Sequence, residues 1–187
     1  VPLTSMFTDD TLAGMARVLK EGSPDGRSPI VEVHPESARP PFVFLHGDFT
    51  AGGFYSRALA LALGPDQPTL IVHPHGLLDD RIPGTIEAMA ADHVSALRAV
   101  RPHGPYVLGG HCNGALVAYE MARQLTAGGE DVPVVVLIEA ESPRLDAGSS
   151  GDRGAARFVK VGKDGAPEVL AARDRTSDID LRYRHVI

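Results

Sequence analysis

The sequence predicts an α/β fold in which a mostly parallel sheet is flanked by helices. Between residues 42 and 138, short apolar runs alternate with longer segments of helical periodicity. The runs are continuously apolar, as expected for strands buried on both faces of a parallel sheet. Their alternation with helical segments favours parallel strands joined by helices that cover both faces. The four runs are 42–45, 69–72, 106–108 and 134–138.

Ahead of this region, one helix and one short strand are expected. The helix falls within residues 1–22, where Thr8 or Asp10 can serve as the N-cap. A linker at 23–29 contains turn-forming Ser, Pro, Asp and Gly, and it separates this helix from a strand at 30–33.

Three further helices are expected between the strands. The first covers residues 54–63, and the second begins after Thr85, an N-cap residue type, and extends to about residue 100. The third begins behind Cys112 and ends at the glycine pair that starts with Gly128.

The segment Gly110-His111-Cys112-Asn113-Gly114 joins a strand-like run to the third helix. This is the layout of a nucleophile elbow, G-x-S-x-G, with cysteine in place of serine. Glycines are needed because side chains beside the sharp turn would clash. The N-terminus of the following helix favours both a thiolate and an oxyanion. The sequence therefore predicts that Cys112 is a catalytic nucleophile.

The carboxyl ends of neighbouring parallel strands bring further candidates to the same edge of the sheet. Glu139 follows the run 134–138 and is the predicted acid, which would orient and support an imidazolium. Glu141, two residues further on, is the alternative acid. The order nucleophile, acid, histidine leaves His185 as the one histidine of this sequence that follows Glu139.

The oxyanion hole is expected to consist of two backbone N–H groups. Asp48, in the loop after the run 42–45, supplies one, and Asn113, directly after the nucleophile, supplies the other. His111 is interpreted as structural. His73 and His75 end a strand and are a conceivable metal pair, but no third ligand is evident, so no metal is predicted.

The composition excludes several other functions. The net charge is −6 and basic residues are scattered, which argues against binding to nucleic acid or to a membrane surface. No apolar stretch approaches the ~20 residues that span a bilayer. The single cysteine rules out an internal disulfide. A cytoplasmic location is expected.

The composition changes after Glu141, close to the end of the predicted core of 30–145. Residues 146–154 are rich in Gly, Ser and charge, and 167–175 and 178–187 have the pattern of amphipathic helices. The segment 146–187 is therefore predicted to be a helical lid over the elbow, and the alternative is a loosely ordered tail.

Residues 30–145 resemble a type I thioesterase domain, the domain that ends nonribosomal peptide synthetases and polyketide synthases. The resemblance is carried by the segments FVFLHGDFTAGGFY, IVHPHGL, PYVLGGHCNGALVAYEMARQL and VPVVVLIEAESP. It implies the α/β-hydrolase fold with a helical lid. Residues 1–22 resemble the last helix of an acyl or peptidyl carrier domain.

Two departures from that family stand out. The family usually has serine as the nucleophile and aspartate as the acid, where this chain has Cys112 and Glu139, and both exchanges preserve the mechanism. The histidine of the family follows a further strand after the lid. The resemblance therefore implies that a C-terminal part carrying this histidine is missing, and recruitment of His185 is the alternative.

The resemblance also implies a function. An acyl or peptidyl chain would arrive as a thioester on the phosphopantetheine of a carrier domain, transfer to Cys112, and leave by hydrolysis or cyclisation. The carrier domain and a small-molecule acyl thioester are the expected partners, and no cofactor is bound. The alternatives are an acyltransferase that passes the chain to an external acceptor, and a non-catalytic docking module with an incomplete triad.

Overall fold

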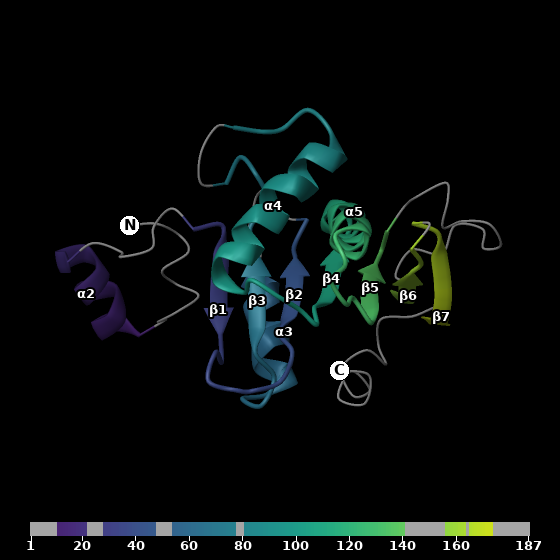
Figure 1. Ribbon diagram of the computed structural model, residues 1–187. Helices are drawn as coiled ribbons and strands as arrows, with labels where there is room; N and C mark the ends of the chain where they lie inside the picture. The colour runs from purple at the N-terminus through teal and green to yellow at the C-terminus, as the bar shows by residue number, and fades with distance from the viewer. Residues whose placement is uncertain are drawn as a thin grey trace.

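The computed structural model describes six parts of the chain: residues 11–21, 28–47, 54–77, 81–140, 156–163 and 165–173. They form one sheet of seven strands in the order β1-β3-β2-β4-β5-β6-β7, with helices on both faces (Figure 1). The strands are β1 (Ile30–Val33), β2 (Phe42–Leu45), β3 (Thr69–Val72), β4 (Val107–His111), β5 (Val134–Ile138), β6 (Ala156–Val161) and β7 (Pro167–Arg173).

The four central strands, β3, β2, β4 and β5, are parallel to their neighbours. The outer strands β1, β6 and β7 each pair in the antiparallel sense. The parallel centre confirms the expectation drawn from the four apolar runs. It also places the carboxyl ends of β2, β4 and β5 side by side, where the candidate residues of the site follow.

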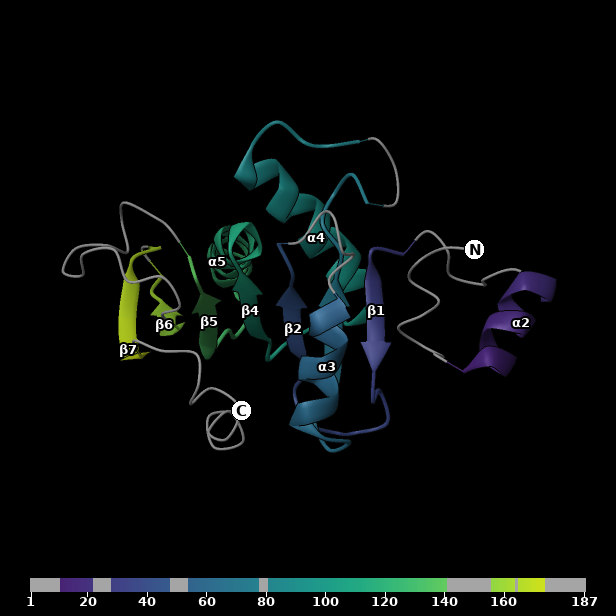
Figure 2. The ribbon, with the colours of Figure 1, turned by 180° about the vertical axis from the view of Figure 1, so that it is seen from behind.

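Helix α3 (Phe54–Leu63) covers one face of the sheet, and α4 (Ile86–Val100) and α5 (Asn113–Ala127) cover the other (Figures 1 and 2). Thr85 caps α4 as expected, because its Oγ1 accepts a hydrogen bond of 3.2 Å from the N–H of Ala88. Helix α5 ends at Gly128, also as expected.

Strand β2 shows why the apolar runs are continuous. Val43 and Leu45 belong to the core between the sheet and helices α4 and α5, while Phe42 and Phe44 belong to the core on the opposite face. Successive side chains of a strand point to opposite faces, so a strand covered on both faces must be apolar at every position. All four side chains are buried.

Helix α2 (Leu12–Glu21) lies beyond the β1 edge of the sheet (Figures 1 and 2). Its N-cap differs from the expected Thr8 or Asp10, both of which lie outside the described residues. Thr11 caps the helix instead, since its Oγ1 accepts a hydrogen bond of 2.9 Å from the N–H of Gly14. Whether residues 1–22 are the end of a carrier domain stays a prediction.

The expected helix over 167–175 is wrong, because residues 167–173 form strand β7. Strands β6 and β7 are an antiparallel hairpin that continues the sheet beyond β5. Their hydrogen bonds and the buried side chains of Val159 and Val161 outweigh the helical preference of the Leu and Ala residues in β7. The described part of the predicted lid, 146–187, is thus sheet, and the second expected helix, 178–187, lies outside the described residues.

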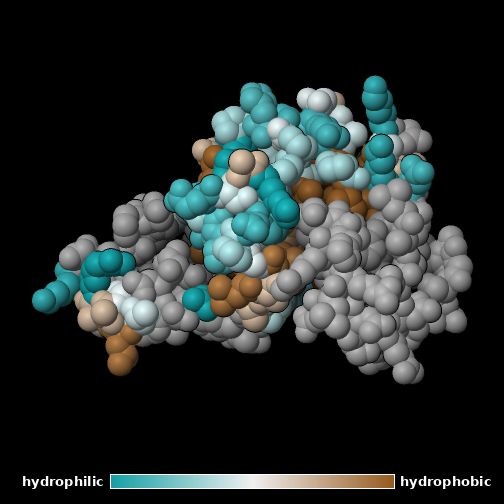
Figure 3. Space-filling view, turned by 90° about the horizontal axis from the view of Figure 1, so that it is seen from below, coloured by the Kyte–Doolittle hydropathy of each residue, from teal (hydrophilic) through white to brown (hydrophobic). Residues whose placement is uncertain are grey.

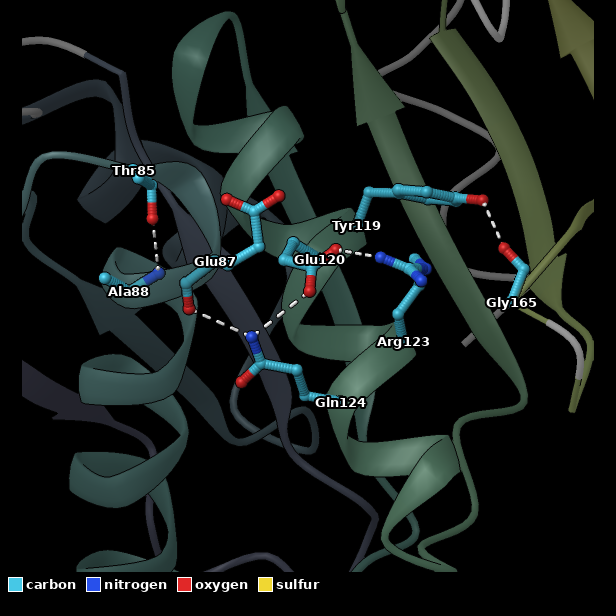
Figure 4. A network of polar contacts seen from close by, with 8 residues as sticks. All are labelled: Thr85, Glu87, Ala88, Tyr119, Glu120, Arg123, Gln124 and Gly165. Atoms are coloured by element: carbon cyan, nitrogen blue, oxygen red, sulfur yellow. Dashed lines mark hydrogen bonds and ion pairs between the residues drawn. The ribbon is translucent and has the colours of Figure 1, made fainter.

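The hairpin is also attached to α5 (Figure 4). Tyr119 of α5 donates its O–H to the backbone carbonyl of Gly165 at 3.1 Å. Gly165 has a φ of 76°, and a Cβ placed on it would lie 2.9 Å from the Arg123 Nε. The Arg123 side chain could move aside, so it is the positive φ that favours glycine at this position of the hairpin turn.

Hydrophilic side chains make up most of the coloured surface in Figure 3, with apolar ones in smaller patches between them. Among the described residues, the large apolar side chains that are exposed are Leu12, Tyr55, Leu61 and Ile82. No helix of the described part has both the length and the apolar character needed to cross a membrane.

Candidate active site

Cys112 occupies the turn between β4 and α5 with the backbone of a nucleophile elbow. Its φ is 52° and its ψ is −123°, a conformation that side-chain-bearing residues rarely adopt. Strain of this kind at a strand-to-helix turn is what lifts a nucleophile out of the sheet. The cysteine is exposed, so its thiol is open to a substrate.

The two glycines of the motif are required by contact distances. A Cβ on Gly110 would lie 2.4 Å from the carbonyl oxygen of Gly114. A Cβ on Gly114 would lie 2.3 Å from the carbonyl oxygen of Leu45. The expectation that bulk beside the turn would clash is therefore confirmed, and the partners are the elbow itself and the end of β2.

Neighbouring strands hold the elbow in place. The N–H of Cys112 donates to the carbonyl of Ile138, the last residue of β5, at 2.9 Å. On the other side, a Cβ on Gly47 would lie 2.6 Å from the carbonyl oxygen of His111 and 3.1 Å from the Asn113 nitrogen. Gly47, two residues after β2, therefore lies against the elbow, and an oxyanion hole built from these two segments requires such an approach.

Of the two predicted oxyanion donors, the structure describes one. Asn113 is the first residue of α5, so its N–H has no partner within the helix and lies at the positive end of the helix dipole. Asp48 and Glu141 lie outside the described residues, as does His185. The oxyanion hole of Asp48 and Asn113 stays a prediction.

Glu139 directly follows β5 and, like Cys112, has a positive φ, of 50°. Its Oε2 is 2.9 Å from the Nε2 of His111, the residue that precedes the nucleophile. The Nδ1 of His111 is in turn 3.3 Å from the hydroxyl of Tyr55 on α3. The structure thus brings Glu139 to the elbow, but to a histidine that sequence reasoning had set aside as structural.

Strand register could have revealed this contact. β4 and β5 are parallel neighbours, and His111 pairs with Ile138 in the register. A residue at the end of one parallel strand and the residue just after the next strand then meet at the same edge. Tyr55 could not have been found this way, because its place depends on the loop that precedes α3.

His73 and His75, the conceivable metal pair, each lie against another histidine. The His73 Nδ1 is 2.7 Å from the His46 Nε2, and the His75 ring lies 4.3 Å from the ring of His93. Burial, and then the neighbouring His46, lower the pKa of His73 to about 4. Burial, and then His75, also lower the pKa of His93 to about 4, although Asp92 opposes this. In the described part of the chain, no group of three or more metal-ligating side chains occurs.

The parallel sheet with helices on both faces and a cysteine at a strained strand-to-helix turn define the class as an α/β-hydrolase fold. Residues 44–173 match the model of the thioesterase domain family. The chain therefore belongs to the thioesterase domain family.

Sequence relatives are large synthetases, of which this chain matches a small part. Indigoidine synthase of Dickeya dadantii is 34% identical over 148 residues, which is 78% of this chain and 10% of the relative. The dimodular nonribosomal peptide synthase of Bacillus subtilis is 31% identical over 140 residues, which is 73% of this chain and 6% of the relative.

Two solved structures show the same fold. The NocB thioesterase domain, in a covalent complex with a fluorophosphonate nocardicin G analogue, is 31% identical with a TM-score of 0.52. The match covers 64% of this chain and 53% of that one, so this chain spans about half of that domain. A four-domain nonribosomal peptide synthetase, holo-AB3403, is 26% identical with a TM-score of 0.60, over 76% of this chain and 11% of that one.

Proposed function

We propose that this chain is the releasing thioesterase domain of an assembly-line synthetase and works through an acyl-Cys112 thioester. The observation that carries the proposal is the strained, exposed Cys112 at the start of α5. Membership in the thioesterase domain family and similarity to a nonribosomal peptide synthase support it. Its substrate is an acyl or peptidyl chain on the phosphopantetheine of a carrier domain, and it works in the cytoplasm.

In the first step, the Cys112 thiolate attacks the thioester carbonyl of the substrate. A bond forms between the Cys112 sulfur and the carbonyl carbon, and the carbon–sulfur bond to the pantetheine arm breaks. The pantetheine thiolate leaves and takes up a proton. The backbone N–H groups of Asp48 and Asn113 stabilise the oxyanion that forms between these events.

In the second step, water or a nucleophile within the bound acyl or peptidyl group attacks the acyl-Cys112 carbonyl, and the cysteine thiolate leaves. Water gives a free acid, and an internal amine or hydroxyl gives a ring. A histidine relays the protons in both steps, with Glu139 supporting its imidazolium form. A thioester on cysteine also retains more acyl-transfer energy than an ester on serine, which suits ring closure.

Product analysis tests this function. A carrier domain loaded with an acyl group is incubated with the natural protein or with its Cys112→Ala variant. The released product is identified by liquid chromatography with mass spectrometry. Free acid or cyclic product that depends on Cys112 supports release. Transfer to an added amine without free acid or ring would show an acyltransferase instead, and no product at all would favour the docking module.

A further inference from the structure

Tyr55, His111 and Glu139 form a line of polar contacts at the elbow. The Tyr55 hydroxyl is 3.3 Å from the His111 Nδ1, and the His111 Nε2 is 2.9 Å from the Glu139 Oε2. Tyr55 comes from α3, His111 ends β4, and Glu139 directly follows β5, the strand beside β4. His111 is the middle member and precedes Cys112 directly.

The chemistry of the partners decides where the protons lie. An ionised carboxylate is acceptor-only, so the Nε2 of His111 carries the hydrogen and donates it to Glu139. In the neutral imidazole the Nδ1 then accepts, and the Tyr55 O–H donates to it. The Tyr55 ring also stands edge-on to the His111 ring at 5.5 Å, which restricts rotation of the imidazole.

The carboxylate of Glu139 is held by one oxygen only. Among the residues that the structure describes, its Oε2 takes the bond from His111 and its Oε1 takes none. The side chain is 42% exposed, so the Oε1 is open to a further donor. Its backbone is fixed beside the nucleophile as well, because the preceding residue, Ile138, accepts the N–H of Cys112.

We propose that His111 is a positioning residue of the thioesterase site. It binds the Glu139 Oε2 and thereby leaves the Oε1 to accept a bond from the histidine of the proposed function. Tyr55 holds the His111 ring in the required orientation and tautomer. This role rests on the proposed function, since it presumes that Cys112 reacts with an acyl thioester.

Two variants of His111 should differ in their rate of Cys112 acylation. His111→Leu removes the donor, so the Glu139 carboxylate is free to rotate, and the maximal rate of Cys112 acylation falls roughly tenfold. His111→Gln keeps an N–H donor at a similar reach and stays within about twofold of the natural chain. The thioester concentration for half-maximal rate is unchanged in both, because His111 does not bind the substrate.

The test measures acyl-adduct formation by intact mass against the concentration of a short acyl-pantetheine thioester, in the full chain. It compares His111→Leu, His111→Gln, Glu139→Leu and the double variant His111→Leu/Glu139→Leu. The matched control is His103→Leu, because His103 also faces a carboxylate, Glu130 at 3.4 Å, away from the elbow. Thermal unfolding of each variant identifies any that fail to fold.

If His111 acts through Glu139, the double variant reacts no more slowly than Glu139→Leu alone. Independent losses that multiply in the double variant, or an equal loss in His111→Gln, would overturn the proposal. If the natural chain forms no Cys112-dependent adduct, the proposed function fails. The positioning geometry is then decided by the ¹⁵N spectrum of the His111 imidazole, where an Nε2–H tautomer that is lost in Glu139→Leu supports it and an Nδ1–H tautomer overturns it.

Discussion

A Cβ on Gly114 would lie 2.3 Å from the carbonyl oxygen of Leu45, so the start of α5 and the end of β2 meet without room for a side chain. Close by, a Cβ on Gly47 would lie 2.6 Å from the carbonyl oxygen of His111, so the residues just after β2 also lie against the elbow. Gly114 thus connects two requirements of the site. It permits the sharp turn, and it lets the end of β2 lie directly against the start of α5.

Gly114→Ala should therefore destabilise the fold strongly. Backbone atoms cannot move aside as a flexible side chain would, so we expect a loss of about 3 kcal/mol in the free energy of unfolding. Denaturant unfolding measures it. Gly84→Ala is the matched control, because nothing lies within 4 Å of a Cβ on Gly84. Equal stability of the two variants would contradict the close approach.

The stability of the fold should fall as the pH drops from about 6.5 toward about 4. His73 and His93 both have a folded-state pKa lowered to about 4 from 6.5, so in this window the unfolded chain binds more protons than the folded chain. Well above pH 6.5 both histidines are neutral in the folded and the unfolded chain, so they do not lower the stability. When the pH falls from about 7.5 to about 5.5, each histidine should lower the free energy of unfolding by about 1 kcal/mol.

Denaturant unfolding of His93→Leu over the same pH range tests the origin of this slope. The variant lacks one of the two histidines, so its stability should depend less steeply on pH than that of the natural chain. An identical slope in both would show that His93 does not contribute. Absolute stability is not the readout here, since Leu changes the packing against His75 as well.

Tyr119→Phe should loosen the β6–β7 hairpin without unfolding the core. The variant removes the hydroxyl that donates to the Gly165 carbonyl (Figure 4), a hydrogen bond of about 1 kcal/mol. Amide hydrogen exchange should become faster in β6 and β7 and stay unchanged in β2 and β4. Uniform acceleration through the whole sheet would show instead that the hairpin and the core open together.

Thr85→Ala should cost about 1 kcal/mol of stability, because the N–H of Ala88 loses its partner at the start of α4. Thr85→Ser keeps the hydroxyl and should restore most of the loss. The free energy of unfolding, measured in denaturant, checks both variants. A Thr85→Ser variant as unstable as Thr85→Ala would show that the methyl group, and not the cap, matters.

The parallel centre of the fold was predictable from sequence because its signals are local. A strand buried on both faces must be apolar throughout, as β2 is with Phe42 to Leu45, and the elbow glycines lie within two residues of Cys112. The N-cap Thr85 is a similar case. Each is determined by neighbours in the chain, so the sequence shows it directly.

What sequence reasoning missed depends on contacts between distant segments. Strand β7 contains Leu170 and two alanines that favour a helix, but pairing with β6 decides its structure. The bond between His111 and Glu139 spans 28 residues and follows from the register of β4 and β5. The pairing of His73 with His46 likewise requires β2 and β3 to be neighbours.

The central claim is that Cys112 accepts the acyl chain. The most direct measurement is the intact mass of the chain after incubation with a short acyl-pantetheine thioester, beside Cys112→Ala treated in the same way. We predict a single acyl adduct on the natural chain, located on Cys112 by peptide mapping and absent from Cys112→Ala. No adduct on the folded natural chain, or an adduct of equal yield on Cys112→Ala, would contradict the account.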